Sequence, residues 1–154
     1  MRGFTLIEAL IYTALFSFII GGAILAVYSI LDGSARTDTA LTRDAEARFV
    51  LQKIAWALNS KTTLIAPADD SSGDSLSLVK TISGTPTTIS ININNGRVYL
   101  TRNAGPAVPL TSERISVDSL LFHNRASAAG APRAIEVTIA INGTTYGPSL
   151  RYAR

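Results

Sequence analysis

The sequence predicts an α+β fold: one long N-terminal helix, membrane-spanning in its first half and amphipathic in its second, packed on an antiparallel β-sheet head. Three observations lead to this class. An apolar run extends to Leu31, and helix-forming residues with apolar periodicity follow it to about Asn59. Alternating apolar segments separated by turn residues fill the rest. With 154 residues, the chain has the size of one domain.

Residues 4–31 form the membrane-spanning part of the predicted helix. No charged residue occurs from Ala9 to Leu31, a stretch of about 35 Å at about 1.5 Å per helical residue. This length crosses a bilayer core of about 30 Å with some tilt. A cleaved secretory signal has a shorter apolar core and a small-x-small cleavage site, and no good site precedes Asp32. We therefore predict a retained segment with Arg2 on the cytoplasmic side and the head outside the cytoplasm.

Glu8 is the unexpected residue in this segment. A charged side chain costs roughly 2.5–3.5 kcal/mol at the bilayer centre and less near an interface. A simple anchor has little use for it, so Glu8 requires a partner. Gly21-Gly22 leaves two interpretations open, close approach of a neighbouring helix or a point where the helix stretches or melts, and the first is favoured.

Residues 32–60 predict an amphipathic continuation of the helix, with a possible bend at Gly33. Asp44 and Arg48 have the spacing of an i,i+4 ion pair, and Arg43 and Glu46 that of an i,i+3 pair. We expect one buried face, built from Leu41, Ala45, Phe49, Ile54, Ala55 and Leu58, with Val50, Leu51 and Trp56 alongside.

Residues 61–154 predict the β-rich head. Residues 62–74 are expected to form a loop, and the strand signals begin at Leu76. The strongest hairpin signal is the Asn94-Asn95-Gly96 turn between two alternating segments, and Asn142-Gly143 predicts a second hairpin. A strand from Ile115 to about Phe122 is expected between them. Pro148 cannot donate to a ladder, so the last segment is an edge or interrupted strand.

Composition and motifs argue against several functions. The net charge of +3 comes from scattered Lys and Arg with no basic block, so we predict no nucleic-acid partner. The chain has no cysteine, and no phosphate loop, nucleophile elbow or metal-binding motif appears. We therefore expect no enzyme activity, small-molecule substrate, cofactor or metal. His123, the single histidine, is interpreted as a surface or edge residue, and Trp56 as core packing first and partner contact second.

Two further motifs have ordinary structural interpretations. The oxygen-rich segment 69–74 has the wrong spacing for an EF-hand and is interpreted as a solvated turn, with an ion site as the minor alternative. Asn142-Gly143-Thr144 matches a glycosylation sequon, but a tight turn between two strands explains Asn-Gly better.

The stretch Gly3-Phe4-Thr5-Leu6-Ile7-Glu8 resembles the type IV pilin signature, in which a peptidase cleaves after the Gly. The helix-then-sheet plan is similar to that of type IV pilins and the pseudopilins of type II secretion. The segments 120–122 and 133–139 are loosely similar to minor pseudopilins of the J or PilW-like type.

The resemblance implies roles for three residues. Residues 1–3 would be a leader removed by prepilin peptidase, with Gly3 before the scissile bond. Phe4 would become an N-methylated terminus, and Glu8 would pair with the Phe4 amine of a neighbouring subunit. The implied partners are other pilin or pseudopilin subunits, the peptidase and the bacterial inner membrane. The implied role is filament assembly for a pilus or for protein transport.

The departures from the family favour a minor subunit. The apolar segment has no proline, the chain has no cysteine for a C-terminal disulfide, and no calcium loop like that of the major pseudopilin is evident. A leader of this length is short, so Met1 need not be the true start. The alternative interpretation is a single-pass membrane-anchored β-domain protein with a ligand-binding or enzymatic function.

Overall fold

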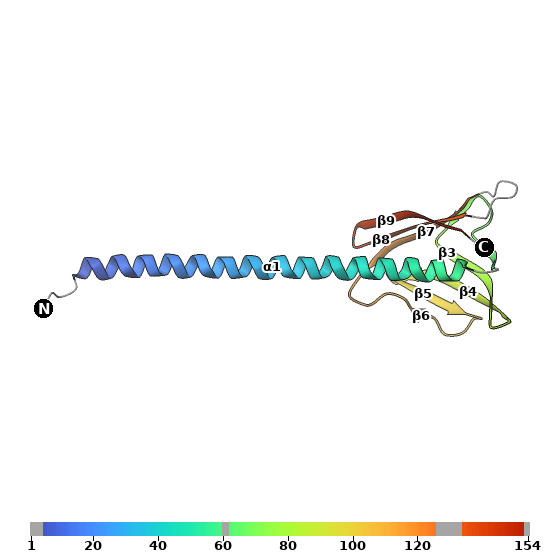
Figure 1. The fold of residues 1–154 in the computed structure, drawn as a ribbon, viewed down its shortest axis with the longest axis horizontal. Coiled ribbons are helices and arrows are strands. Elements are labelled where there is room, and N and C mark those ends of the chain that lie inside the picture. Colours follow the sequence, from blue (N-terminus) through green and yellow to red (C-terminus); the bar gives the residue numbers. More distant parts are fainter. Residues whose placement is uncertain (1–4, 60–61, 126–133, 153–154) are drawn as a thin grey trace. The chain divides into compact units, whose positions relative to one another are not determined.

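The computed structural model describes residues 5–59, 62–125 and 134–152 (Figure 1). Within these ranges one long helix, α1 (Leu6–Leu58), precedes nine strands. The chain divides into two compact units, residues 1–41 and 42–154, so the first part of α1 belongs to one unit and its last part belongs to the same unit as the sheets. The predicted α+β class, with a long apolar N-terminal helix and an antiparallel β head, is confirmed.

The strands of the second unit form two antiparallel sheets. A five-stranded sheet has the order β1-β3-β4-β5-β6, and a four-stranded sheet has the order β2-β7-β8-β9 (Figure 1). The bounds are β1 (Thr62–Ala66), β2 (Ser71–Gly73), β3 (Ser75–Ile82), β4 (Thr85–Asn94), β5 (Arg97–Arg102), β6 (Val108–Pro109), β7 (Val117–Arg125), β8 (Ala134–Ile141) and β9 (Thr144–Tyr152).

One core joins α1 to both sheets. Alternate residues of β3, β4, β5, β7 and β8 point into it, as the period of two requires. From α1 it receives Ala47, Val50, Ile54, Ala57 and Leu58. This face agrees with the predicted one at Ile54 and Leu58. It differs at Leu41, Ala45 and Phe49, which are exposed. Apolar residues occur around most of this part of the helix, so spacing alone did not determine which face meets the sheets.

The two Asn-Gly hairpins are confirmed. Asn95 and Gly96 both have positive φ, 47° and 68°, and connect β4 to β5. Asn142 and Gly143 do the same, at 46° and 73°, between β8 and β9. Positive φ at both central positions is typical of the type I′ turn, whose twist matches that of the strands. The predicted edge position of Pro148 is also confirmed, since β9 is the last strand of its sheet and its register with β8 shifts between Val137 and Ile139.

Two strand predictions were wrong. Residues 62–74 are not a plain loop, because they contain β1 and β2, which pair with β3 and β7. Their sequences lack clean alternation because each is a short edge strand with one neighbour. The strand expected from Ile115 begins instead at Val117. A register shift between Val117 and Ser119 explains why the apolar residues change phase before Leu120.

The predicted ion pairs along the helix were replaced by contacts with distant residues of the second unit. The hydroxyl of Tyr146 donates a hydrogen bond to Asp44 and accepts one from Arg43 Nε at 3.0 Å. Glu46 accepts a hydrogen bond from the backbone N–H of Ser112 at 2.8 Å. These side chains therefore bind partners that are distant in sequence, Tyr146 in β9 and Ser112 between β6 and β7, which spacing along a helix does not reveal. Gly33 lies within α1 and does not end it, and Asp32 pairs with Arg36 at 2.8 Å nearby.

Candidate functional site: the N-terminal segment and the Trp56 groove

The first candidate site is the start of α1. Thr5 precedes the helix, and its carbonyl oxygen accepts hydrogen bonds from the backbone N–H groups of Glu8 (3.1 Å) and Ala9 (3.2 Å). Glu8 therefore lies in the first helical turn, where the partial positive charge of the helix N-terminus favours a carboxylate. The other two residues of the predicted assembly site, Gly3 and Phe4, lie outside the described residues, as does the predicted leader 1–3.

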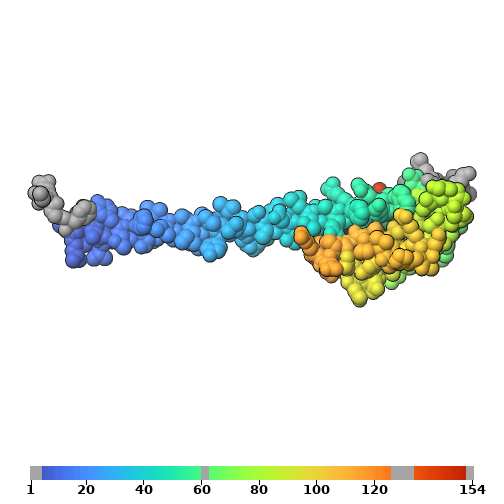
Figure 2. All heavy atoms as spheres, turned by 90° about the horizontal axis from the view of Figure 1, so that it is seen from below, coloured from blue at the N-terminus to red at the C-terminus, as the bar shows by residue number. Residues whose placement is uncertain are grey.

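The first unit exposes an apolar surface. The large apolar side chains of this segment are mostly more than half exposed, including Leu6 at 82% and Phe18 at 86% (Figure 2, blue). Its hydroxyl groups fold back onto the helix: Thr13 Oγ1 donates to the Ala9 carbonyl and Ser17 Oγ to the Thr13 carbonyl, both at 2.8 Å. The surface therefore presents satisfied hydroxyls among apolar side chains, which suits lipid or an apolar protein surface.

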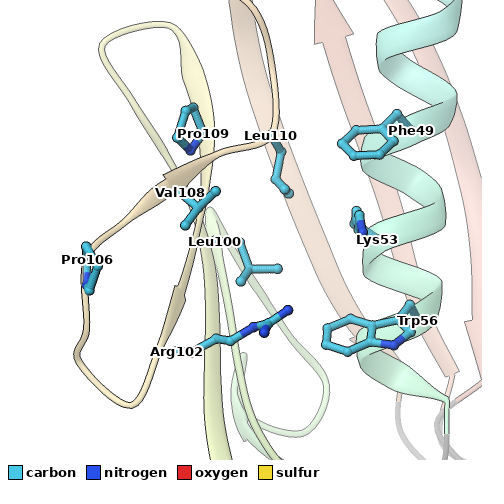
Figure 3. Close-up of a pocket in the computed structure, with 9 residues that line it drawn as sticks. All are labelled: Phe49, Lys53, Trp56, Leu100, Arg102, Pro106, Val108, Pro109 and Leu110. Atoms are coloured by element: carbon cyan, nitrogen blue, oxygen red, sulfur yellow. The ribbon is translucent and has the colours of Figure 1, made fainter.

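A second candidate site lies in the second unit, between α1 and the β5–β6 edge of the larger sheet (Figure 3). We call it the Trp56 groove. Its volume is about 460 Å³, and it is lined by Phe49, Lys53, Trp56, Leu100, Arg102, Pro106, Val108, Pro109 and Leu110. Phe49, Lys53 and Trp56 follow the i, i+4, i+7 spacing that places residues on one helical face. This face is distinct from the buried one.

Cations gather around the aromatic rings of the groove. The Lys53 ammonium lies 5.2 Å from the centroid of the Phe49 ring, and the Arg102 guanidinium lies 5.4 Å from that of Trp56. Both distances are within the range of cation–π attraction. Among the described residues, neither Lys53 nor Arg102 forms an ion pair. Both cations are therefore available to a bound anion.

Lys80 of β3 holds Trp56, one of the residues that line the groove, in place. It is 6% exposed, and its ammonium lies 4.6 Å from the Trp56 ring centroid and donates hydrogen bonds to the backbone carbonyls of Trp56 and Asn59, the latter at 2.6 Å. Burial lowers the pKa of Lys80 from its ordinary value of 10.5, because desolvation disfavours the charged form. Lys80 therefore fixes Trp56 at the end of α1. Together with Arg102, it places two cations beside the Trp56 ring.

Trp56 was interpreted from sequence as core packing, but it is 37% exposed and lines the groove. The groove itself was missed. Its wall residues, such as Arg102 and Val108, are distant in sequence from the helix, and only the i, i+4, i+7 spacing on the helix was a signal.

The closest approach to a catalytic arrangement is a row across the smaller sheet. Ser72 pairs with His123, and His123 pairs with Glu136, in adjacent strands. Ser72 Oγ lies 3.0 Å from His123 Nδ1, but Glu136 is held by Arg125 at 3.2 Å. Because Glu136 already has a cationic partner, the row lacks the carboxylate that would orient the imidazole in a triad.

The 69–74 segment is not simply a solvated turn. Residues 71–73 form β2, and Asp69 accepts a hydrogen bond from the buried Asn124 side chain at 3.2 Å. Within the described part of the chain, no group of three or more His, Cys, Asp or Glu side chains is placed to hold a metal ion.

The fold and these sites define a class: an α+β protein with a β-rich unit and a single described helix that is long and apolar enough to cross a membrane, with a mean hydropathy of 2.3 in its most apolar window. No protein-family model, curated protein or solved structure matches this chain.

Proposed function

We propose that this chain is a minor pilin-like (pseudopilin) structural subunit of a type IV pilus or a type II secretion pseudopilus. It is processed by prepilin peptidase and assembled through its N-terminal helix. One observation supports this proposal above all others: Glu8 lies in the first turn of an apolar helix, a few residues after a Gly3-Phe4 junction.

Cleavage between Gly3 and Phe4 creates a new amine four residues before Glu8. In an apolar environment, an amine and a carboxylate each lack solvation, and each neutralises the other. A pair between Glu8 of one subunit and the Phe4 amine of the next sets the axial register of neighbouring helices. The uncovered side chains of α1 then pack against those of the neighbours.

Glu8 also has a local structural interpretation. Thr5-Leu6-Ile7-Glu8 matches the capping-box pattern, in which a Glu or Gln at the third helical position stabilises the helix N-terminus. The two roles make different demands on the side chain, because a cap accepts Gln and a charge pair does not.

The deciding experiment is processing. The full chain is expressed in bacteria with and without a prepilin peptidase, extracted from membranes and analysed by intact mass spectrometry. We expect loss of residues 1–3 and addition of a methyl group at Phe4 only with the peptidase. Gly3→Leu, which changes the residue before the scissile bond, is the matched control and should stay uncleaved. An intact Met1 terminus in both strains would refute the proposal.

The proposal places the chain in the bacterial inner membrane, with its head outside the cytoplasm. In this orientation Arg2 lies on the cytoplasmic side of the apolar segment. Protease added to spheroplasts should then remove the head, whereas protease added to inverted vesicles should leave it protected.

The second candidate is a membrane-anchored β-domain protein that binds a ligand, and the Trp56 groove is the observation in its favour. This function requires neither cleavage after Gly3 nor Glu8. The processing experiment therefore separates the two candidates.

A further inference from the structure

The Trp56 groove presents apolar side chains that the described chain leaves uncovered. Phe49 is 43% exposed, Trp56 37% and Val108 54%. Burying such surface gains roughly 25 cal/mol per Å² of apolar area, so an apolar occupant is favoured. The volume of about 460 Å³ accommodates a few side chains and falls in the range of ligand sites.

The charges around the groove indicate which polar groups its occupant carries. None of the described residues that line the groove is acidic, whereas Lys53 and Arg102 are among them and Arg102 extends toward Trp56 (Figure 3). Three acidic side chains of this unit already have partners: Asp44 with Tyr146, Glu46 with the Ser112 N–H and Glu113 with Arg97. An occupant that brings carboxylates therefore supplies the anions that the two cations lack.

We propose that the Trp56 groove binds an acidic peptide segment of a partner protein, with an apolar side chain seated between Phe49 and Trp56 and carboxylates on Lys53 and Arg102. The basis is charge complementarity combined with an apolar floor. Two cations beside an apolar floor suit this ligand better than nucleic acid, which requires an extended basic surface. The inference goes beyond the proposed function and does not depend on it.

The chain carries its own reporter for this site, because Trp56 is its only tryptophan. Intrinsic fluorescence of the full chain in non-ionic detergent therefore monitors the groove alone. The probe is a blocked peptide in which Glu alternates with Leu and a central Phe. One control peptide replaces every Glu with Lys, and a second keeps Glu but replaces the apolar residues with Ser.

The acidic apolar peptide should change the emission of Trp56 in a saturable way, and added NaCl should weaken binding because exposed charges are screened. The Lys peptide should give no saturable change, and the Ser peptide a much weaker one. Equal responses to the Glu and Lys peptides, or no response to the Glu peptide, would overturn the proposal.

Charge-reversal variants test whether the Glu peptide binds at the groove. Lys53→Glu and Arg102→Glu should each raise the Kd for the Glu peptide by about tenfold or more. Arg114→Glu makes the same change in net charge at an exposed position outside the lining, and it should leave the Kd within about twofold. If all three variants weakened peptide binding equally, net charge alone would explain the binding, and the proposal would be wrong.

Collisional quenching of the free protein tests the charge argument without any variant. Cations beside Trp56 concentrate anions, so iodide should quench its emission more strongly than caesium does, relative to neutral acrylamide. The reverse order would overturn the proposal. A shift of Trp56 emission with protein concentration alone would assign the groove to a second copy. A response to phosphatidylglycerol vesicles without any response to the Glu peptide would assign it to lipid. Either result would refute the peptide proposal.

Discussion

Lys80 and Trp56 are joined twice: the Lys80 ammonium donates a hydrogen bond to the Trp56 backbone carbonyl and lies 4.6 Å from the centroid of its indole ring. The last turn of α1 contains no basic residue of its own. The carbonyls at a helix C-terminus lack partners within the helix and carry partial negative charge. Lys80 of β3 therefore supplies the positive charge at the C-terminus of α1. The same side chain packs against the Trp56 ring, which lines the groove.

Lys80→Met should destabilise the second unit. The substitution keeps most of the apolar stem but leaves the carbonyls of Trp56 and Asn59 without this donor. Loss of hydrogen bonds from a charged group corresponds to about 1.5–3 kcal/mol in the free energy of unfolding. Denaturant unfolding followed by Trp56 fluorescence measures it. Lys53→Met, in the groove but with only a ring contact, is the control and should change stability by less than about 1 kcal/mol. Equal stability of the two variants would show that Lys80 does not cap the helix.

Tyr146 predicts an alkaline loss of stability. Burial, and secondly the hydrogen bond to Asp44, raise the pKa of Tyr146 above its ordinary value of 10.0. The unfolded chain then releases the phenolic proton at a lower pH than the folded chain. The stabilisation is complete below pH 10.0 and is lost as pH rises from there through the folded pKa.

Tyr146→Phe removes the titrating hydroxyl and should flatten this part of the stability curve. It should also lower stability at pH 7 by about 1–3 kcal/mol, because Asp44 and Arg43 lose a shared partner. Urea unfolding of both proteins from pH 7 to 11 measures the two effects. Tyr99→Phe, which keeps the number of tyrosines equal, is the control. Identical alkaline slopes for Tyr146→Phe and the unaltered protein would contradict the assignment.

The Glu8 series separates a charge pair from a helix cap. Glu8→Gln keeps the capping-box pattern but removes the charge, and Glu8→Lys reverses it. Under the proposed function, both variants should be cleaved by prepilin peptidase and fail to enter the filament, while the head stays folded. The measurement compares the subunit in the sheared-filament and membrane fractions. Normal incorporation of Glu8→Gln together with a defect in Glu8→Lys, which cannot form the capping box, would assign Glu8 to the cap.

Gly96 and Gly143 form a matched pair for hairpin stability. Both have positive φ, where an L side chain is strained. A Cβ at Gly96 would also lie 3.1 Å from Ser116 Oγ, whereas a Cβ at Gly143 would meet nothing within 4 Å. Each Ala variant should cost about 1 kcal/mol from backbone strain, with a further loss for Gly96→Ala. Thermal unfolding measures the difference. A larger loss for Gly143→Ala would show that the Ser116 contact is not important.

The hairpins could be predicted because they depend on local physics. Asn-Gly at the centre of an alternating segment requires only that two adjacent residues accept positive φ, and both turns form as expected. The polar contacts of the helix could not be predicted from the sequence. Arg43 and Glu46 have the right spacing for a local pair, but Tyr146 of β9 and the backbone of Ser112 offer part-buried partners instead. Nothing in the helix sequence contains that information.

The candidate sites divide in the same way. Glu8 stands out in the sequence because one charge interrupts an apolar run, and the structure adds only that it lies in the first turn. The groove depends on the proximity of Trp56 and Arg102, which are far apart in sequence, so it became visible only in the tertiary structure. Phe49 and Trp56 were assigned to the core because large apolar side chains are usually buried there.

The sequence by itself determined the long apolar helix, the carboxylate at its start and the alternating strands with their Asn-Gly turns. Each of these follows from periodicity, length or backbone preference within a few residues. Only the tertiary structure decided that Ala47 and Ala57 face the core while Phe49 and Trp56 line a groove, and that the strands divide into two sheets. The physical reason is that periodicity determines which residues share a face, whereas the packing of strands from distant parts of the chain determines which face is covered.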